Sequence, residues 1–147
     1  MLRKAIKDLE RTPKIQKPVY PDLEAAITAR TQAVGIISRE AAKSLCHRGT
    51  AEVEGGVTWT SDPRLKMTSA MRLTEPLVEA FIKKIECPTL FVGAEQGFKD
   101  RMPNISERLE LLAQAKVVTV PGNHHHHLEK DTFAAVGEQV LTFISEL

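Results

Sequence analysis

The hydrophobic positions of the chain follow two patterns, which change near residue 85. Before that point, apolar residues recur at helical spacing, and we predict helices over about residues 2–9 and 39–48. Ser38 is a favourable N-cap for the second of these helices. Another helix is expected to open at Pro21, because proline is favoured in the first turn of a helix. The first part of the chain is therefore predicted to be helical and to lack a system of strands.

Prolines and glycines interrupt this helical pattern in two places. Pro18 and Pro21 enclose a short linker, in which the prolines disfavour regular structure. Weak alternation over residues 50–60, around Gly55 and Gly56, indicates a hairpin or an extended excursion. Both places are expected to connect helices.

Short apolar runs of strand type appear in the second part of the chain. The expected elements are, in order, a strand over residues 88–93, a helix over 104–114, a strand over 116–120 and an amphipathic helix over 131–147. Asn104 and Glu107 have the spacing of a capping box, which predicts the start of the first of these helices.

The order strand, helix, strand, helix predicts an α/β fold that contains a βαβα unit with two parallel strands. Parallel sheets usually have several strands and are covered on both faces, so we expect this unit to be the end of a larger sheet. The strand over residues 88–93 would then expose an unpaired edge. Because such edges favour association, we predict a homodimer or a domain-swapped assembly through this edge.

Composition and charge argue against several classes of protein. The 147 residues include 20 Lys and Arg against 19 Asp and Glu, a net charge of +1, so no overall field attracts nucleic acid or an anionic membrane. No apolar run approaches the ~20 residues of a membrane span and no signal-peptide pattern is present, so a cytoplasmic location is expected. Cys46 and Cys87 lie outside any CxxC spacing and are expected to be free thiols. No motif indicates a cofactor, and none is expected.

Candidate catalytic residues follow the two predicted strands. In α/β folds, the chemistry is usually carried by loops beyond the carboxyl ends of the strands. The loop over residues 93–102 contains Glu95 and Asp100, and the loop over residues 121–127 contains four consecutive histidines. An acid after one strand and a histidine after the next are in the order of the last two members of a Ser/acid/His triad in α/β-hydrolases.

Three sequence segments carry a family resemblance. They are PTLFVGAEQGF from Pro88, VVTVPGNHHHHLEK from Val117 and DPRLK from Asp62. Their order and spacing resemble the α/β-hydrolase superfamily, in particular its serine hydrolase-like branch. The resemblance implies the C-terminal half of such an enzyme, acting on ester or C–C bonds. Residues 1–85 would form a helical cap region, and residues 86–147 the C-terminal βαβα part of the core.

The resemblance also assigns roles to residues of the two loops. It places the catalytic histidine three residues before the His-Leu-Glu that starts at His127, which gives His124 as the general base. Gly97 stands where these enzymes usually carry the triad aspartate, so the chain departs from the family pattern there. Asp100 is the favoured substitute because Gly97 permits a turn toward His124. Glu95 is the second candidate, and a solvated loop residue is an equally good interpretation of it.

The histidine run also suggests a metal site or a purification tag. Adjacent loop residues rarely place more than two imidazoles on one ion, so a metal site is the weaker hypothesis and we assign no metal ligands. A purification tag would lie at a terminus, whereas this run is internal and precedes a predicted helix.

A nucleophile elbow is missing from these 147 residues. No serine stands in a Gly-x-Ser-x-Gly sequence, whose small flanking residues allow the strained turn that exposes the nucleophile. Cys46 lies in a predicted helix, where its neighbour His47 cannot fold back to activate it. We therefore predict no turnover by this chain alone, and a small-molecule substrate only if an N-terminal half is supplied. The alternative is a non-catalytic binding or assembly module that uses a cap pocket and the exposed sheet edge.

Overall fold

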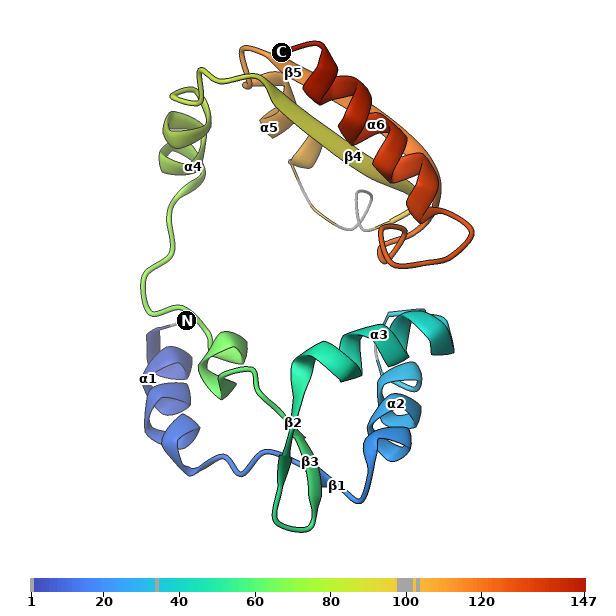
Figure 1. Cartoon of the computed structure of the whole chain (residues 1–147). Coiled ribbons are helices and arrows are strands. Elements are labelled where there is room, and N and C mark those ends of the chain that lie inside the picture. The colour runs from blue at the N-terminus through green and yellow to red at the C-terminus, as the bar shows by residue number, and fades with distance from the viewer. Residues whose placement is uncertain (1, 34, 98–101, 103) are drawn as a thin grey trace. The chain divides into compact units, whose positions relative to one another are not determined.

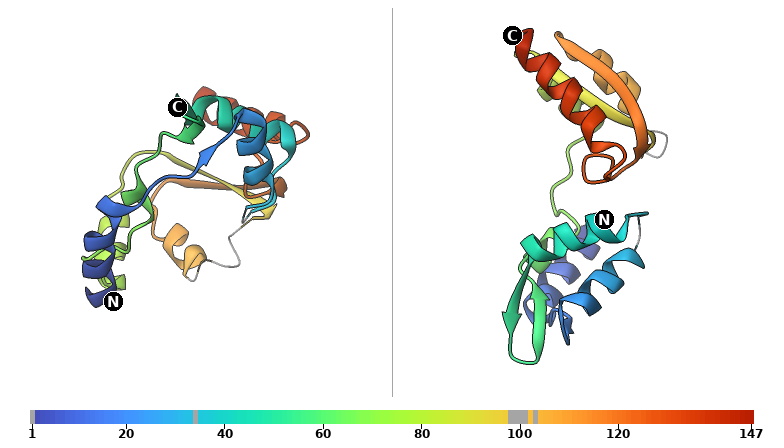
Figure 2. Two further views of the ribbon diagram at one scale, coloured as in Figure 1. Left: turned by 90° about the horizontal axis from the view of Figure 1, so that it is seen from below. Right: turned by 45° about the vertical axis from the view of Figure 1, so that its right-hand side comes forward.

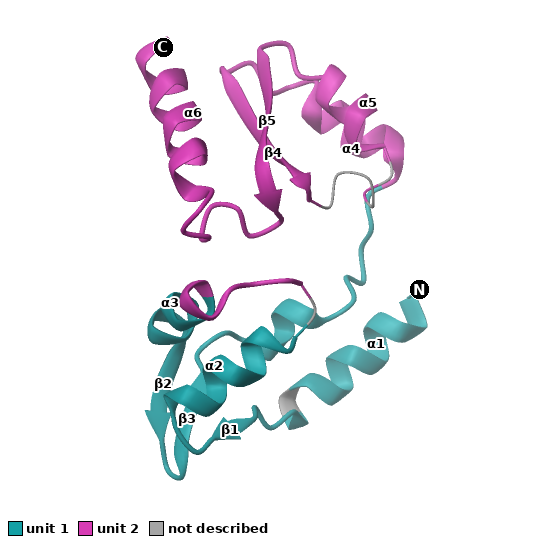
Figure 3. Cartoon of the chain, turned by 90° about the vertical axis from the view of Figure 1, so that its right-hand side faces the viewer, with its two compact units in different colours: residues 1–33, 42–73 teal, residues 34–41, 74–147 magenta. Residues whose placement is uncertain are grey.

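The structure, a computed structural model, describes residues 2–33, 35–97, 102 and 104–147 (Figure 1). The chain divides into two compact units (Figure 3). Unit 1 comprises residues 1–33 and 42–73, and unit 2 comprises residues 34–41 and 74–147. The domain division after residue 85 stays a prediction of the sequence.

Unit 1 combines helices with a small antiparallel sheet (Figure 2). Its helices are α1 (Leu2–Arg11), α2 (Leu23–Thr31), most of α3 (Arg39–Gly49) and the short 3-10 helices η1 (Thr12–Lys14) and η2 (Pro63–Lys66). Its strands are β1 (Val19–Tyr20), β2 (Thr50–Val53) and β3 (Gly56–Trp59), in the order β1-β3-β2.

The sheet confirms the hairpin at residues 50–60, but the prediction that the first part lacks strands is wrong. β1 pairs with β3 in antiparallel register, with Val19 opposite Thr58 and Tyr20 opposite Val57. This strand occupies the segment that was expected to be an irregular linker. It lies at an edge of the sheet, where flanking prolines are tolerated because no ladder hydrogen bond is needed on the open side.

Side-chain caps fix the starts of α2 and α3. Asp22 is the N-cap of α2, and its Oδ1 accepts a hydrogen bond from the backbone N–H of Ala25 at 2.7 Å. Oγ of Ser38 accepts from the backbone N–H of Ala41 at 3.1 Å, which confirms the predicted N-cap of α3. Each bond satisfies a backbone donor that has no partner within its own helix.

Small side chains form the buried core of unit 1. Ala5, Ala26, Ile27, Ala42 and Cys46 are at most 1% exposed. Burial in these surroundings raises the pKa of the Cys46 thiol, because it disfavours the charged thiolate. The thiol is therefore protonated and enclosed, which agrees with the sequence argument against Cys46 as a nucleophile.

Unit 2 contains the expected βαβα arrangement. Its elements are α4 (Glu75–Ile82), β4 (Thr89–Gln96), α5 (Ile105–Glu110), β5 (Ala115–Asn123) and α6 (Phe133–Ser145). β4 and β5 are parallel, with Phe91 opposite Val117 and Ala94 opposite Val120. α6 and α5 lie on opposite faces of these strands (Figures 1 and 2). The predicted α/β fold class is confirmed.

The lengths of these elements differ from the sequence prediction. Both strands continue to the carboxyl side, because their parallel pairing extends to Gln96 and Asn123. α5 is shorter than expected at both ends. Asn104 is its N-cap but has a left-handed backbone with φ of 63° and makes no side-chain capping bond, so the predicted capping box is wrong.

An ion pair connects the helices α4 and α5. Nε and Nη2 of Arg108 donate to the two carboxylate oxygens of Glu75, at 2.8 and 2.7 Å. This bidentate contact lowers the pKa of Glu75 below its ordinary value, because the guanidinium stabilises the carboxylate.

Among the described residues, no helix is long and apolar enough to cross a membrane.

Candidate active site

The four histidines occupy the turn between β5 and α6. Pro121 to Asn123, expected in the loop, belong to the end of β5, so the turn begins at His124. Gly122 precedes it with a left-handed backbone, φ 108°. A Cβ at this position would lie 3.0 Å from Cγ2 of Thr132 and 3.2 Å from Cβ of His126, so the turn packs directly against the glycine.

Asn123 organises the beginning of the turn. Its side-chain Oδ1 accepts from the backbone N–H of His125 at 2.7 Å, and its backbone oxygen accepts from the N–H of His126 at 3.0 Å. Nδ1 of His126 lies 2.9 Å from the same oxygen. Because a carbonyl oxygen only accepts, Nδ1 of His126 carries the hydrogen in this contact. These bonds hold the residues on either side of His124.

The end of the turn is fixed from the side of α6. Oγ1 of Thr132 donates to the backbone oxygen of His126 at 2.7 Å. The backbone oxygen of His125 accepts from the N–H of Leu128 at 2.7 Å. The backbone oxygen of Glu129 accepts from the N–H groups of Thr132 and Phe133 at 3.1 and 2.9 Å. Hydrogen bonds between residues that are close in the sequence thus form a framework that fixes the conformation of the turn.

His124 is exposed within this framework. It directly follows β5, and its ring lies edge-on to the ring of His125, with centroids 5.1 Å apart and planes at 61°. The pKa of His127, three residues after His124, is lowered by partial desolvation of its ring and by the neighbouring rings of His126 and His124. Positive charge on His126 or His124 therefore disfavours positive charge on His127.

A distant segment of the same unit contacts this turn. The backbone N–H of Ser38 donates to Oε1 of Glu129 at 2.9 Å. A Cβ added at Gly35 would lie 3.3 Å from Nε2 of His125, so the backbone at Gly35 runs close to that imidazole. Sequence reasoning missed Gly35, Ser38 and Glu129 as parts of the site.

Of the two candidate acids, Glu95 and Asp100, only Glu95 is among the residues that the structure describes. Glu95 was expected in a loop, but β4 extends through it, and its side chain is exposed. The pairing shifts between Ala94 and Gln96, so Glu95 occupies an irregularity in the ladder. Gln96 then pairs with Asn123, which brings the end of β4 beside the base of the histidine turn. Asp100 lies outside the described residues.

No group of three His, Cys, Asp or Glu side chains that could hold a metal ion occurs among the residues that the structure describes.

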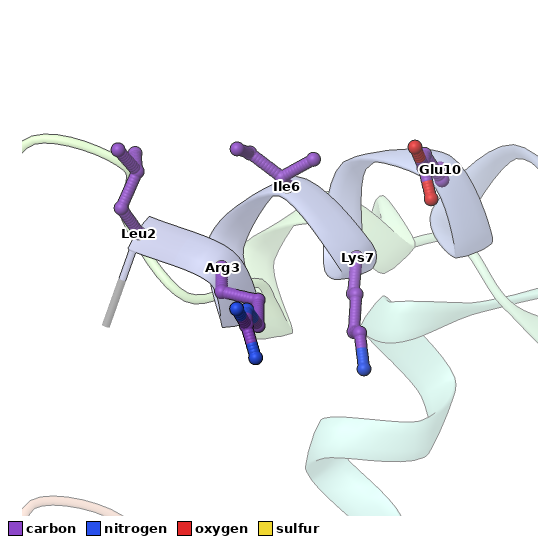
Figure 4. Close-up of a pocket in the computed structure, with 5 residues that line it drawn as sticks. All are labelled: Leu2, Arg3, Ile6, Lys7 and Glu10. Carbon is purple, nitrogen blue, oxygen red and sulfur yellow. The ribbon is translucent and has the colours of Figure 1, made fainter.

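Figure 4 shows one surface hollow, lined by residues that all project from α1: Leu2, Arg3, Ile6, Lys7 and Glu10. Because one helix supplies all these residues, the hollow is a helix face without an opposing wall. It contains none of the candidate catalytic residues.

Comparisons with known proteins identify proteins that this chain resembles. No family model matches the chain. The human protein named serine hydrolase-like protein 2 is 26% identical, over 90% of this chain and 47% of its own length. A solved structure of a hypothetical protein from Pseudomonas aeruginosa PAO1 is 39% identical, with a TM-score of 0.87 over 98% of this chain and 51% of that chain. The chain is related to the α/β-hydrolases.

A further solved structure agrees with this relationship. The thioesterase domain from the curacin biosynthetic pathway is 27% identical, with a TM-score of 0.72 over 96% of this chain and 50% of that chain. The resemblance predicted from the sequence is thus confirmed. The chain spans about half the length of each of these three proteins.

Proposed function

We propose that the chain supplies the histidine part of a serine hydrolase active site, with His124 as the general base. The observation that carries the proposal is the position of His124. It is an exposed imidazole immediately beyond β5, at the carboxyl end of the parallel strand pair, within a turn fixed by hydrogen bonds on both sides. In α/β folds this end of the sheet is where catalytic side chains gather.

The proposed chemistry is acyl transfer or C–C bond hydrolysis on a small molecule. For an ester, the imidazole of His124 takes the proton of a serine hydroxyl as its oxygen bonds to the carbonyl carbon. The same proton then passes to the departing alcohol as the ester C–O bond breaks. A water molecule, deprotonated by His124 in turn, cleaves the acyl-enzyme and regenerates the serine. A histidine suits both steps because its ordinary pKa lies near neutral pH.

The acid that orients the imidazole is proposed to be Asp100, with Glu95 as the alternative. Asp100 is favoured on sequence grounds, since it follows Gly97 in the segment after β4. Glu95 sits where the strand ladder is irregular, one residue before the Gln96 that pairs with Asn123. Its carboxylate therefore comes from the strand end nearest to the base of the histidine turn.

The serine is proposed to come from the half of the hydrolase that this chain does not match. These 147 residues contain no Gly-x-Ser-x-Gly sequence, and Cys46 is enclosed in unit 1. A general base without a nucleophile gives no acyl-enzyme. We therefore expect a polypeptide of these residues alone to be inactive.

Complementation tests this function. The chain is co-expressed with the half of the Pseudomonas protein that it does not match, and the mixture is treated with a fluorophosphonate probe, which labels activated serines. The added half should be labelled only when this chain is present, and the purified chain alone should stay unlabelled. A one-to-one acylation burst from the chain alone, or labelling of the added half in its absence, would contradict the proposal.

A second candidate function is assembly through an open surface of unit 2. In the described part of the chain, β4 pairs with β5 on one side only. α6 also exposes an apolar face, formed by Phe133 (53% exposed), Val140 (39%) and Ile144 (58%), and Leu147 (74%) follows just after the end of the helix. Unpaired strand edges and contiguous apolar faces are typical of association surfaces. We propose that a second copy of the chain occupies this surface when no hydrolase half is present.

Sedimentation tests the assembly. The chain should sediment as a dimer at high concentration, and Ile144→Glu should shift it toward the monomer by placing a charge in the apolar face. Thr142→Glu is the matched control, because Thr142 is exposed on the opposite side of the same helix and should leave the dimer intact. A monomeric wild-type chain at high concentration would exclude this function.

A further inference from the structure

The segment before α3 is held against the histidine turn at two points. Residues 35–38 belong to the 34–41 segment of unit 2, and the other segment of that unit begins only at residue 74 (Figure 3). One point is the hydrogen bond from the backbone N–H of Ser38 to Oε1 of Glu129, at 2.9 Å. The other is the close approach of Gly35 to the imidazole of His125.

Both partners of the hydrogen bond are themselves well anchored. Ser38 caps α3 through its hydroxyl, and the neighbouring Ile37 is buried. On the other side, the backbone of Glu129 takes part in the framework that joins the histidine turn to α6. The bond therefore connects two ordered pieces of chain.

The chemistry of the bond makes it stronger than an ordinary turn contact. A carboxylate that accepts from a backbone N–H forms a charge-assisted bond, roughly twice as strong as a bond between neutral groups. Gly35 has a left-handed backbone with φ of 95°, and a side chain there would press against Nε2 of His125. The backbone conformation at Gly35 and the bond at Ser38 thus keep the segment beside the His125 ring.

We propose that Glu129 is a positioning residue for His124. This inference rests on the proposed function of His124. The carboxylate of Glu129 holds residues 35–38 beside His125, and the His125 ring in turn lies edge-on to the His124 ring. Without the carboxylate, the segment is released, His125 gains rotational freedom, and the His124 imidazole is less often aligned with a serine.

Nuclear magnetic resonance on the intact chain tests the anchor without any activity. In Glu129→Ala, amide exchange at Ser38 should accelerate about tenfold, which corresponds to the loss of roughly 1.4 kcal/mol of hydrogen bonding, and the ring signals of His125 should shift. Glu129→Gln keeps an oxygen acceptor and should restore most of the protection. Glu138→Ala, at an exposed position of α6, is the matched control and should behave as wild type.

A kinetic readout separates this inference from the proposed function. In the complemented enzyme, Glu129→Ala should lower kcat about tenfold with an unchanged KM, and Glu129→Gln should recover it. If the wild-type complement is inactive, the proposed function of His124 fails, and the positioning role fails with it even if Ser38 remains protected. If the wild-type complement is active but Glu129→Ala leaves Ser38 exchange, the His125 signals or kcat at wild-type values, the positioning role alone is overturned.

Discussion

The Gly56→Ala variant is expected to lose about 3 kcal/mol of unfolding free energy, a large part of the stability of a chain of this size. A Cβ at Gly56 would lie 1.9 Å from the backbone oxygen of Tyr20 and 2.9 Å from that of Pro21. Neither oxygen belongs to a flexible side chain, so β1 must move away from β3. The backbone of Gly56 also has φ of 139°, which L-amino acids rarely adopt. Urea denaturation of the purified chain measures the loss.

Gly55→Ala, at the neighbouring turn residue, provides the matched control. Gly55 also has a left-handed backbone, with φ of 85°, but a Cβ added there meets nothing within 4 Å. It should therefore show only the conformational cost, about 1 kcal/mol. Equal losses in the two variants would mean that backbone conformation alone accounts for the effect, and that the approach of Gly56 to Tyr20 is unimportant.

The pairing of β1 with β3 explains why the sequence did not reveal β1. Local patterns identified the hairpin because β2 and β3 are joined by the two residues Glu54 and Gly55, and a glycine in so short a connection favours a tight turn. β1 has two residues, and its pairing joins Val19 to Thr58, which lie far apart in the sequence. A strand that exists only through such a distant partner leaves no periodic signal, whereas two nearby prolines strongly indicate a linker.

Unit 2 was easier to predict because its strands carry their own signal. β4 contains a continuous apolar run from Leu90 to Ala94, and β5 contains three valines, at 117, 118 and 120, interrupted only by Thr119, as expected for parallel strands with two covered faces. The ends of the elements were not predictable. The turn residues from Pro121 to Asn123 continue β5 because Asn123 pairs with Gln96, and Asn104 adopts a left-handed conformation that rules out its expected capping bond.

In the candidate site, too, features with a local sequence signal could be predicted and a contact between distant residues could not. His124 could be placed beyond a strand from the local order of apolar run, turn and helix. The bonds of Asn123 have a local signal as well, since asparagine commonly bonds to the backbone two residues ahead. The bond between Ser38 and Glu129 joins positions 91 residues apart, and no spacing in a single sequence indicates such a contact.

The His124→Ala variant is expected to show the largest functional effect. In the complemented enzyme it should reduce kcat for ester hydrolysis about 10³-fold or more, because the serine proton then has no acceptor and the leaving group no donor. KM should change little, since the imidazole acts mainly in the transition state. Stopped-flow measurement of acyl-enzyme formation, together with probe labelling, reports the loss at the first chemical step.

His127→Ala distinguishes a specific base from a general effect of the histidine run. His127 lies in the same turn, and its ring is 5.7 Å from that of His126 between centroids, yet the proposed mechanism gives it no proton to carry. Its replacement should keep kcat within about threefold of wild type, because the bonds of Asn123 and Thr132 that shape the turn do not involve its side chain. If His127→Ala abolishes labelling while His124→Ala preserves it, the base is misassigned. A loss in both variants would indicate that the run acts as a unit, against the assignment of one residue as the base.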